Sequence, residues 1–316
     1  MKKILTILML LTLFPIKADA LVVAPVVIDG IEVEPGGYEF VQIEILSEKE
    51  KPVMINWLVQ EFVAKGEEGQ QEYIVGETGG ITDWITLPEE SYVLTPNETL
   101  KLPVSIAIPA GAEPGGYYAT LFFTEAAADE DGSVGIVTRV GIPILVKAAG
   151  EVIESGELVS FETVDGKFFA HVPVSFTSRL QNTGTVHVKP SGTILIKNLF
   201  GRTVAELPAN LNESNVLPDS ARQVKSSWIK IDAEEPAGFF AKAAHEWRNF
   251  ALGRYTADLE MIYGTEGQTF TASACFWVFP WHLFLTVILV LAAIIGAIIL
   301  YNKMIIRKAI NKKKTK

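Results

Sequence analysis

Three histidines, His171, His187 and His245, are the side chains before the C-terminal apolar segment that best suit metal binding or acid–base chemistry. They are well separated in the sequence, whereas a metal site needs several converging ligands. The sequence contains no Gly-x-Ser-x-Gly, His-Glu-x-x-His or Cys-x-x-Cys motif. We therefore predict no metal site, no cofactor and no catalytic residues.

Carboxylates could form two other kinds of site. A glycosidase needs two of them facing one cleft, but nothing in the spacing singles out a pair. The cluster Asp129-Glu130-Asp131 lies between two predicted strands and is followed by Gly132. This pattern predicts a solvated hairpin turn, and a calcium site is the alternative, because hard oxygen ligands gather there.

Two aromatic residues suit carbohydrate binding. Tyr73 follows a polar segment predicted to be an exposed loop, 65–72, and Trp84 lies nearby in the sequence. Their rings could stack on sugars; the alternative is that both pack in the core or against a loop.

The N-terminus has the pattern of a secretory signal peptide. Lys2-Lys3 is followed by a predominantly apolar run of eleven residues, Ile4 to Phe14, and then by Ala18-Asp19-Ala20. This order predicts a leader over residues 1–20, cleaved after Ala20. The alternative, an uncleaved anchor, needs a longer apolar run.

The other end predicts a membrane span. Phe276 to Tyr301 contains no Asp, Glu, Lys or Arg, and Trp277, Trp281 and Tyr301 stand where interfacial anchors would. The tail, residues 302–316, carries seven basic and no acidic residues. The positive-inside rule then places the tail in the cytoplasm and residues 21–275 outside.

Charge and cysteine content narrow the partners. Between Leu21 and Tyr301 there are 17 basic and 36 acidic residues, a net charge near −19, which opposes binding to nucleic acid. The single cysteine, Cys275, excludes an intramolecular disulfide. We expect Cys275 to be passive, with acylation or an intermolecular disulfide as the alternatives. An outside portion without disulfides favours a bacterial envelope.

The outside portion predicts two all-β domains. Short apolar or alternating runs recur between turn residues, which is typical of immunoglobulin-like β-sandwiches. We expect them over residues 21–148 and 149–275. The predicted strands are Tyr38–Leu46, Val53–Phe62, Leu100–Ile108, Tyr117–Thr124, Val134–Val146, Val172–Thr177, Thr193–Lys197, Gln223–Ile231, Tyr255–Tyr263 and Thr269–Phe276.

A weak internal repeat supports this division. A Leu and Pro turn precedes the strand at Leu100 and again the strand at Gln223, and Gly116-Tyr117-Tyr118 corresponds to Gly253-Arg254-Tyr255. A Tyr that opens a strand after a Gly turn is typical of a tyrosine corner. We assign this role to Tyr118, with Tyr117 as the alternative, and to Tyr255.

Residues 236–250 break the β pattern. Pro236 and the acids before it suit a helix start, and Phe240, Ala244 and Trp247 follow at helical spacing. Phe239, Phe240, Trp247 and Phe250 then form either a lid on the sandwich or a contact with the membrane interface. Because this helix precedes the strand at Tyr255, we expect it at the membrane end of the second domain.

The sequence also resembles a known family. The resemblance lies in Val22–Val33, Pro35-Gly36, Trp57, Trp84-Ile85, Thr95-Pro96, Val104–Pro109, Pro114–Ala119 and, more loosely, Gln181–His187 and Lys197–Arg202. These residues are similar to those of the WxL-interacting proteins of Gram-positive cell surfaces. That family combines a signal peptide, two immunoglobulin-like domains, one transmembrane helix and a lysine-rich tail. The resemblance implies peptidoglycan binding by the first domain and a surface-protein partner for the second.

These observations favour a binding protein over an enzyme. Our main expectation is a membrane-anchored scaffold of the bacterial envelope that binds peptidoglycan and a surface protein. The alternative is a membrane-tethered assembly chaperone that acts by β-strand addition. A weaker alternative is an enzyme with an unrecognised site. A free edge strand would favour the chaperone, and exposed aromatic rings in a groove would favour the scaffold.

Overall fold

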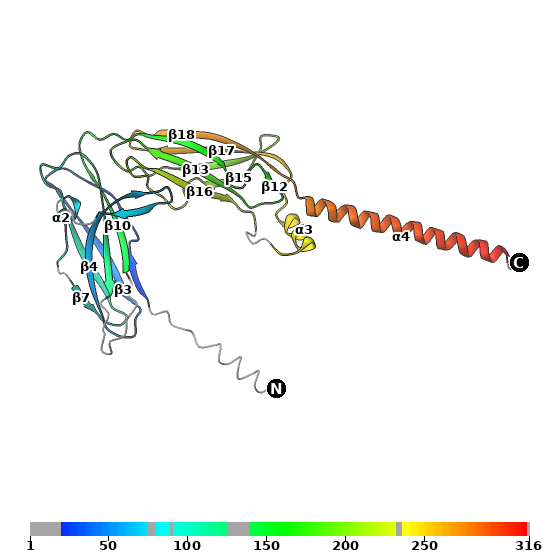
Figure 1. Ribbon diagram of the computed structural model, residues 1–316, viewed down its shortest axis with the longest axis horizontal. Coiled ribbons are helices and arrows are strands. Elements are labelled where there is room, and N and C mark those ends of the chain that lie inside the picture. The colour runs from blue at the N-terminus through cyan, green and yellow to red at the C-terminus, as the bar shows by residue number, and fades with distance from the viewer. Residues whose placement is uncertain (1–19, 75–79, 89–90, 126–138, 232–235, 315–316) are drawn as a thin grey trace, which may run out of the picture. The chain divides into compact units, whose positions relative to one another are not determined.

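The computed structural model describes residues 20–74, 80–88, 91–125, 139–231 and 236–314, with side chains as far as Arg307. The predicted leader and Asp129–Asp131 lie outside these residues. The chain forms two compact units: residues 1–65, 70–153 and 184–187 make up the first, and 66–69, 154–183 and 188–316 the second. Both are β-sandwiches, and an apolar helix ends the second, as the fold class predicted (Figure 1).

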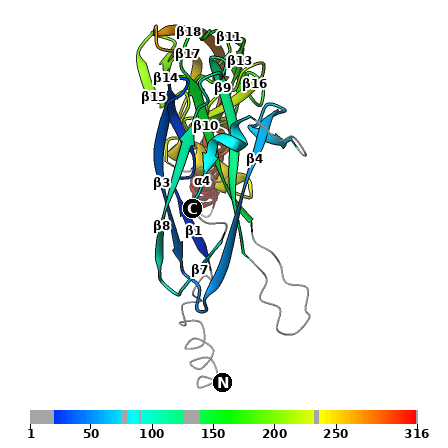
Figure 2. The same ribbon diagram turned by 90° about the vertical axis from the view of Figure 1, so that its left-hand side faces the viewer.

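The first unit is a sandwich of two sheets. One layer has the strand order β1-β3-β8-β6, and the other has β2-β10-β9-β4-β5 with β7 also paired to β4 (Figure 2). The elements are β1 (Leu21–Ala24), β2 (Ile28–Val33), β3 (Tyr38–Ser47), β4 (Val53–Lys65), β5 (Gln70–Tyr73), α2 (Ile81–Trp84), β6 (Ile85–Thr86), β7 (Ser91–Leu94), β8 (Thr99–Ala107), β9 (Gly115–Glu125) and β10 (Arg139–Ala148).

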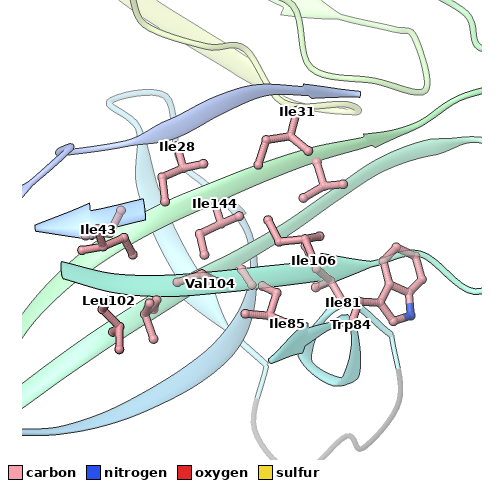
Figure 3. Close-up of a cluster of buried hydrophobic side chains, with 14 of the residues drawn as sticks. Ile28, Ile31, Ile43, Ile81, Trp84, Ile85, Leu102, Val104, Ile106 and Ile144 are labelled. Carbon is pink, nitrogen blue, oxygen red and sulfur yellow. The ribbon is translucent and has the colours of Figure 1, made fainter. Parts of the chain in front are cut away.

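The core of the first unit lies between its sheets. Alternating residues of β3, β8 and β10 point inward, as the strand period of two requires, and Ile43, Val104 and Ile144 are fully buried. Short helix α2 adds Ile81 and Trp84 at one end of this core (Figure 3). Hydrophobic burial between the layers therefore fixes which face of each strand is inside.

The second unit has one three-stranded sheet, β11-β13-β16, and one five-stranded sheet, β12-β18-β17-β14-β15. Its elements are β11 (Gly156–Thr163), β12 (Phe168–Phe169), β13 (Val174–Asn182), β14 (Ser191–Asn198), β15 (Thr203–Pro208), β16 (Ala221–Trp228), α3 (Phe239–Arg248), β17 (Gly253–Tyr263), β18 (Gln268–Val278) and α4 (Trp281–Lys314). A separate core includes Phe176, Trp228 and Phe276, all nearly or fully buried.

The two units share one arrangement of strands, to which the first unit adds β6 and β7. In each, an early short strand pairs in parallel with the last strand: β2 with β10, and β12 with β18. The remaining pairs are antiparallel, and the predicted repeat maps onto equivalent strands, β8 with β16 and β9 with β17. This is the pairing expected of immunoglobulin-like sandwiches.

All ten predicted strands are present, with ends shifted by a few residues and with 134–138 outside the described residues. The strand prediction did not include β1, β2, β5, β6, β7, β11, β12 and β15. The helix predicted over residues 236–250 is shorter in the structure. It runs from Phe239 to Arg248, and Asn249 is its C-cap.

Candidate interaction surfaces

The end of the second unit from which α4 leaves brings α3 beside the start of α4. In the β17–β18 ladder Gly253 pairs with Val278, so the start of β17 and the end of β18 lie together. Helix α3 comes just before β17 and α4 just after β18, and the two helices are in contact (Figure 1). This position for α3 agrees with the prediction from strand order.

One face of α3 packs on α4 through a polar link. Glu246 is fully buried, and its Oε1 accepts a hydrogen bond from His282 Nδ1 at 2.5 Å. Its Oε2 accepts one from the backbone N–H of Leu283 at 2.7 Å. Leu283 belongs to the first turn of α4, whose N–H groups have no partner within the helix, so Glu246 caps α4 from outside.

Two further contacts hold α3 in place. Phe239 packs against Trp281 and His282 with ring centroids 6.1 and 5.4 Å apart. At the other end of α3, buried Asn249 accepts a hydrogen bond from the N–H of Ile231 at 3.2 Å and donates one to His245 Nε2 at 3.1 Å. Buried polar groups without partners would cost free energy, so these bonds define one docked position of α3.

The other face of α3 is exposed. Phe240 is 71% exposed, Trp247 68% and Phe250 44%. The lid alternative therefore fails for these three residues, and only Phe239 is partly buried. Of the predicted set, the structure places Phe239 against α4 and leaves the other three rings uncovered.

The predicted membrane anchors surround the start and end of an apolar helix. Trp281–Arg307 is long and apolar enough to cross a membrane, and none of its most apolar window is buried against the chain. Trp277, at the end of β18, and Trp281 are each about half exposed, and Tyr301 is 61% exposed.

The tyrosine corners are at Tyr117 and Tyr255. The hydroxyl of Tyr117 donates to the backbone oxygen of Glu113 at 2.9 Å, and that of Tyr255 accepts from the N–H of Leu252 at 3.2 Å. Tyr118 was the wrong choice of two neighbours: its ring is buried against Phe62 and His187, and burial raises its pKa.

The proposed sugar-binding rings are packed against the protein. Trp84 is 8% exposed and lies 4.4 Å from the ring of Tyr117, centroid to centroid. Tyr73 is partly buried, 5.1 Å from the ring of Phe122 and 6.3 Å from that of Phe62. Both residues therefore pack against other side chains, and neither presents a free ring face in a groove.

An open strand edge is present in the first unit. Strand β10 pairs with β9 along its whole length, from Arg139 to Ala148, but β2 covers its other side only from Ile144 to Ala148. Among the described residues, no strand covers that side of Arg139–Pro143. Pro143 fits there, because a residue without an N–H is tolerated at a sheet edge.

The chain passes from one sheet to the other between β1, which pairs with β3, and β2, which pairs with β10. This change leaves a second strand edge open. Strand β1 covers β3 only from Glu44 to Ser47, so the described residues leave the preceding part of β3 uncovered on that side. Tyr38 and Phe40 lie on this part and are 65% and 64% exposed. Among the described residues, each layer of the first unit therefore has at least one half-open edge.

No group of three or more metal-binding side chains occurs within the described parts of the chain. His171 and His245 do come together, with ring centroids 5.0 Å apart, although their separation in the sequence did not predict this contact. A shallow hollow beside β17 contains Asp258, which binds Lys197 at 2.8 Å and Ser273 at 2.6 Å. These bonds hold the pKa of Asp258 below its usual range, so the carboxylate already has its partners.

Cys275 is exposed on β18. Arg254 Nη2 donates to its Sγ at 3.3 Å, and this bond lowers the pKa of the thiol. Sequence reasoning also missed Glu246, His282 and Asn249. The available signal was that Glu246 is the single acid between Pro236 and Phe250, seven residues after Phe239 and therefore on the same helix face.

No protein-family model matches the chain, and no curated protein matches it. Among solved structures, the class 5 fimbriae chaperone CfaA is 9% identical, with a TM-score of 0.39, over 81% of this chain and 99% of that one. The E. coli chaperone DraB is 10% identical, with a TM-score of 0.34, over 82% and 96%. The CsuC–CsuE chaperone–subunit complex of Acinetobacter baumannii is 11% identical, with a TM-score of 0.36, over 81% and 98%. The strand pairing of the two sandwiches is seen within this chain and does not depend on these similarities.

Proposed function

We propose that this protein is a membrane-anchored binding module that holds an extended segment of a partner protein by β-strand addition along β10. The observation that carries the proposal is the half-open edge at Arg139–Pro143. An added strand there would lie end to end with β2 and bond backbone groups of β10 that no described strand pairs. The predicted strand from Val134, outside the described residues, would lengthen this edge.

Several other strand edges are less suited to this role. Strands β1 and β6 are only four and two residues long. Strand β16 carries Arg222 and Lys225, and charged side chains are a common way to discourage added strands. The part of β3 at Tyr38 and Phe40 is the strongest competitor, because it is open and apolar, and the experiment below includes it.

The experiment is photo-crosslinking in living cells. A photoreactive amino acid replaces Arg139 on β10, Phe40 on β3 or, as a control, Ile262 on β17. Ile262 is 48% exposed, but β17 is paired on both sides. We expect adducts at position 139 that map to one extended segment of a partner. Adducts only at position 40 would move the site to β3, and equal adducts at all three positions would contradict strand addition.

We further propose that α4 crosses the membrane, with both sandwiches outside and the basic tail in the cytoplasm. The charge-free span and the seven basic residues after it support this orientation. The native Cys275 allows a direct test because it is exposed and is the single cysteine. A membrane-impermeant maleimide should label it in intact cells.

The matched control moves the cysteine to the tail, in a Cys275→Ser, Lys312→Cys variant. We expect this variant to be labelled only after the cells are permeabilised. Labelling of the tail in intact cells, with protection of Cys275, would reverse the orientation.

The scaffold expectation concerns a different ligand. Peptidoglycan binding and a WxL-type companion came from resemblance, and the two rings chosen for sugar contact are packed, as described above. An open strand edge is the feature expected of a protein that acts by strand addition. We therefore place strand addition first.

A further inference from the structure

We infer that α3 is an interfacial helix, which Glu246 ties to the first turn of α4 so that Trp247 and its neighbours lie among the lipid headgroups. This inference rests on the proposed membrane anchor. It adds a second membrane contact, which lies parallel to the surface instead of crossing it. The surface that α3 would bind is the region of the lipid bilayer where headgroups meet acyl chains.

The depth of α3 follows from its link to α4. Glu246 Oε2 lies 2.7 Å from the backbone nitrogen of Leu283, and the apolar helix begins two residues earlier, at Trp281. Phe239 packs on Trp281 itself. The depth of α3 in the membrane must therefore match that of Trp281 to within about one helical turn.

The exposed face of α3 has the composition of an interfacial helix. Phe240 and Trp247 lie on one face, seven residues apart, and Phe250 follows with its ring 6.5 Å from that of Trp247. Phe279, between β18 and α4, is 54% exposed as well. Aromatic rings at this level are typical of membrane interfaces, where an apolar body and a wet surface meet.

A basic residue fits the same surface. Arg248 follows Trp247 on α3 and is exposed, whereas the one acid of this helix, Glu246, is turned inward and fully buried. The helix thus presents aromatic side chains and a basic one outward, which suits a phospholipid surface. Water would otherwise cover three large rings at the point where the chain meets lipid.

The polar link explains how α3 stays there. A first-turn N–H group at the entrance to lipid cannot rely on water as a partner, and leaving it unpaired is costly. Glu246 supplies the acceptor from α3 itself. The bond that docks α3 on α4 therefore also gives the N–H group of Leu283 its partner. While this bond holds, α4 cannot tilt freely relative to α3.

The test uses full-length protein in vesicles with and without brominated lipids, which quench nearby tryptophans. Subtracting the fluorescence of a Trp→Phe variant from that of the wild type isolates one tryptophan. Trp247 is the test residue, Trp281 reports on the anchor, and Trp57 in the first unit is the matched control. We expect the Trp247 and Trp281 signals to be mostly lost in brominated lipid and the Trp57 signal to be unchanged.

Each alternative outcome has its own meaning. Quenching of Trp281 without quenching of Trp247 would overturn this inference and leave the anchor intact. Quenching of neither would contradict the proposed anchor itself. Quenching of Trp57 to the same extent would show that the loss of fluorescence is not specific to α3 and would overturn this inference.

A second variant tests the link. In Glu246→Ala, α4 should stay inserted, so Trp281 remains quenched, while the Trp247 signal recovers as α3 leaves the interface. Unchanged circular dichroism of the sandwiches would exclude general unfolding as the cause. If Trp247 stays as strongly quenched in Glu246→Ala as in wild type, Glu246 does not hold α3 at the membrane.

Discussion

The hydroxyl of Tyr117 makes one well-placed bond, to the backbone oxygen of Glu113 at 2.9 Å. In Tyr117→Phe the ring should stay on Trp84, but the Glu113 carbonyl loses this partner. We expect the free energy of unfolding of the first unit to fall by about 1 kcal/mol, the usual net value of one hydrogen bond. Chemical denaturation measures it.

The control is Tyr38→Phe, because Tyr38 is 65% exposed and removal of its hydroxyl should change stability by less than about 0.5 kcal/mol. Equal denaturation midpoints for Tyr117→Phe and Tyr38→Phe would remove the corner role of Tyr117.

Cys275 offers a prediction about pH. Its pKa is lowered chiefly because Arg254 bonds the sulfur and favours the thiolate. The rate of alkylation by iodoacetamide should therefore reach half its maximum at a lower pH than for an ordinary thiol. In Arg254→Gln that midpoint should move to higher pH. Arg202→Gln, an exposed change elsewhere in the second unit, should leave it unchanged.

The sequence could not decide between Tyr117 and Tyr118, for a physical reason. Neighbouring residues of a strand point to opposite faces, so one residue of register exchanges their roles. Along β9 both faces are buried from Ala119 to Phe123, so no alternation of polar and apolar residues marks the core side. The pairing of β9 with β10 and β4 settles the choice, and that pairing is a property of the folded unit.

At the scale of elements, the β14–β17 pair depends on the absence of a side chain at position 192. A Cβ on Gly192 would lie 2.1 Å from the backbone oxygen of Glu260 and 2.7 Å from Met261 Cα. Gly192→Ala should thus push the two strands apart and lower the free energy of unfolding of the second unit by about 1–3 kcal/mol, as overpacking does. Thermal unfolding of the full chain measures it.

Gly111→Ala is the matched change, because nothing lies within 4 Å of a Cβ at that position. We expect it to leave unfolding nearly unchanged. A Gly192→Ala protein as stable as Gly111→Ala would contradict the close approach of β14 and β17.

The presence of the long strands was easier to predict from the sequence than the way in which α3 packs. Long strands have alternating or continuous apolar runs, whereas two of the missed strands, β6 and β12, are only two residues long and carry almost no pattern. In α3, aromatic residues occupy both Phe239 and Phe240, so apolar spacing allowed two buried faces. The buried face is the one that carries Glu246, because its carboxylate finds partners on α4.

At the scale of the whole molecule, the repeat in the sequence reflects a repeated topology. The turns before β8 and β16 and the tyrosines that open β9 and β17 occupy equivalent positions in two sheets of the same order. Only the second unit adds a helix before its tyrosine strand. That difference places α3 at the end of the unit from which α4 leaves.

Each unit has its own core, which leads to the last prediction. Ile106 belongs to the first core and Ile196 to the second, and both are fully buried. Replacing either with Ala should lower the stability of its own unit by about 2–5 kcal/mol through lost burial and the cavity left behind. Hydrogen exchange of the full chain, resolved by peptide, should show faster exchange in that unit alone.

Leu211→Ala is the control, because Leu211 is 70% exposed and its loss should leave exchange unchanged in both units. Faster exchange in both units from either core variant would mean that the two sandwiches unfold as one cooperative block. Independent responses would instead mean that the first unit, with its open β10 edge, can loosen around a partner while the second unit keeps α3 and α4 together.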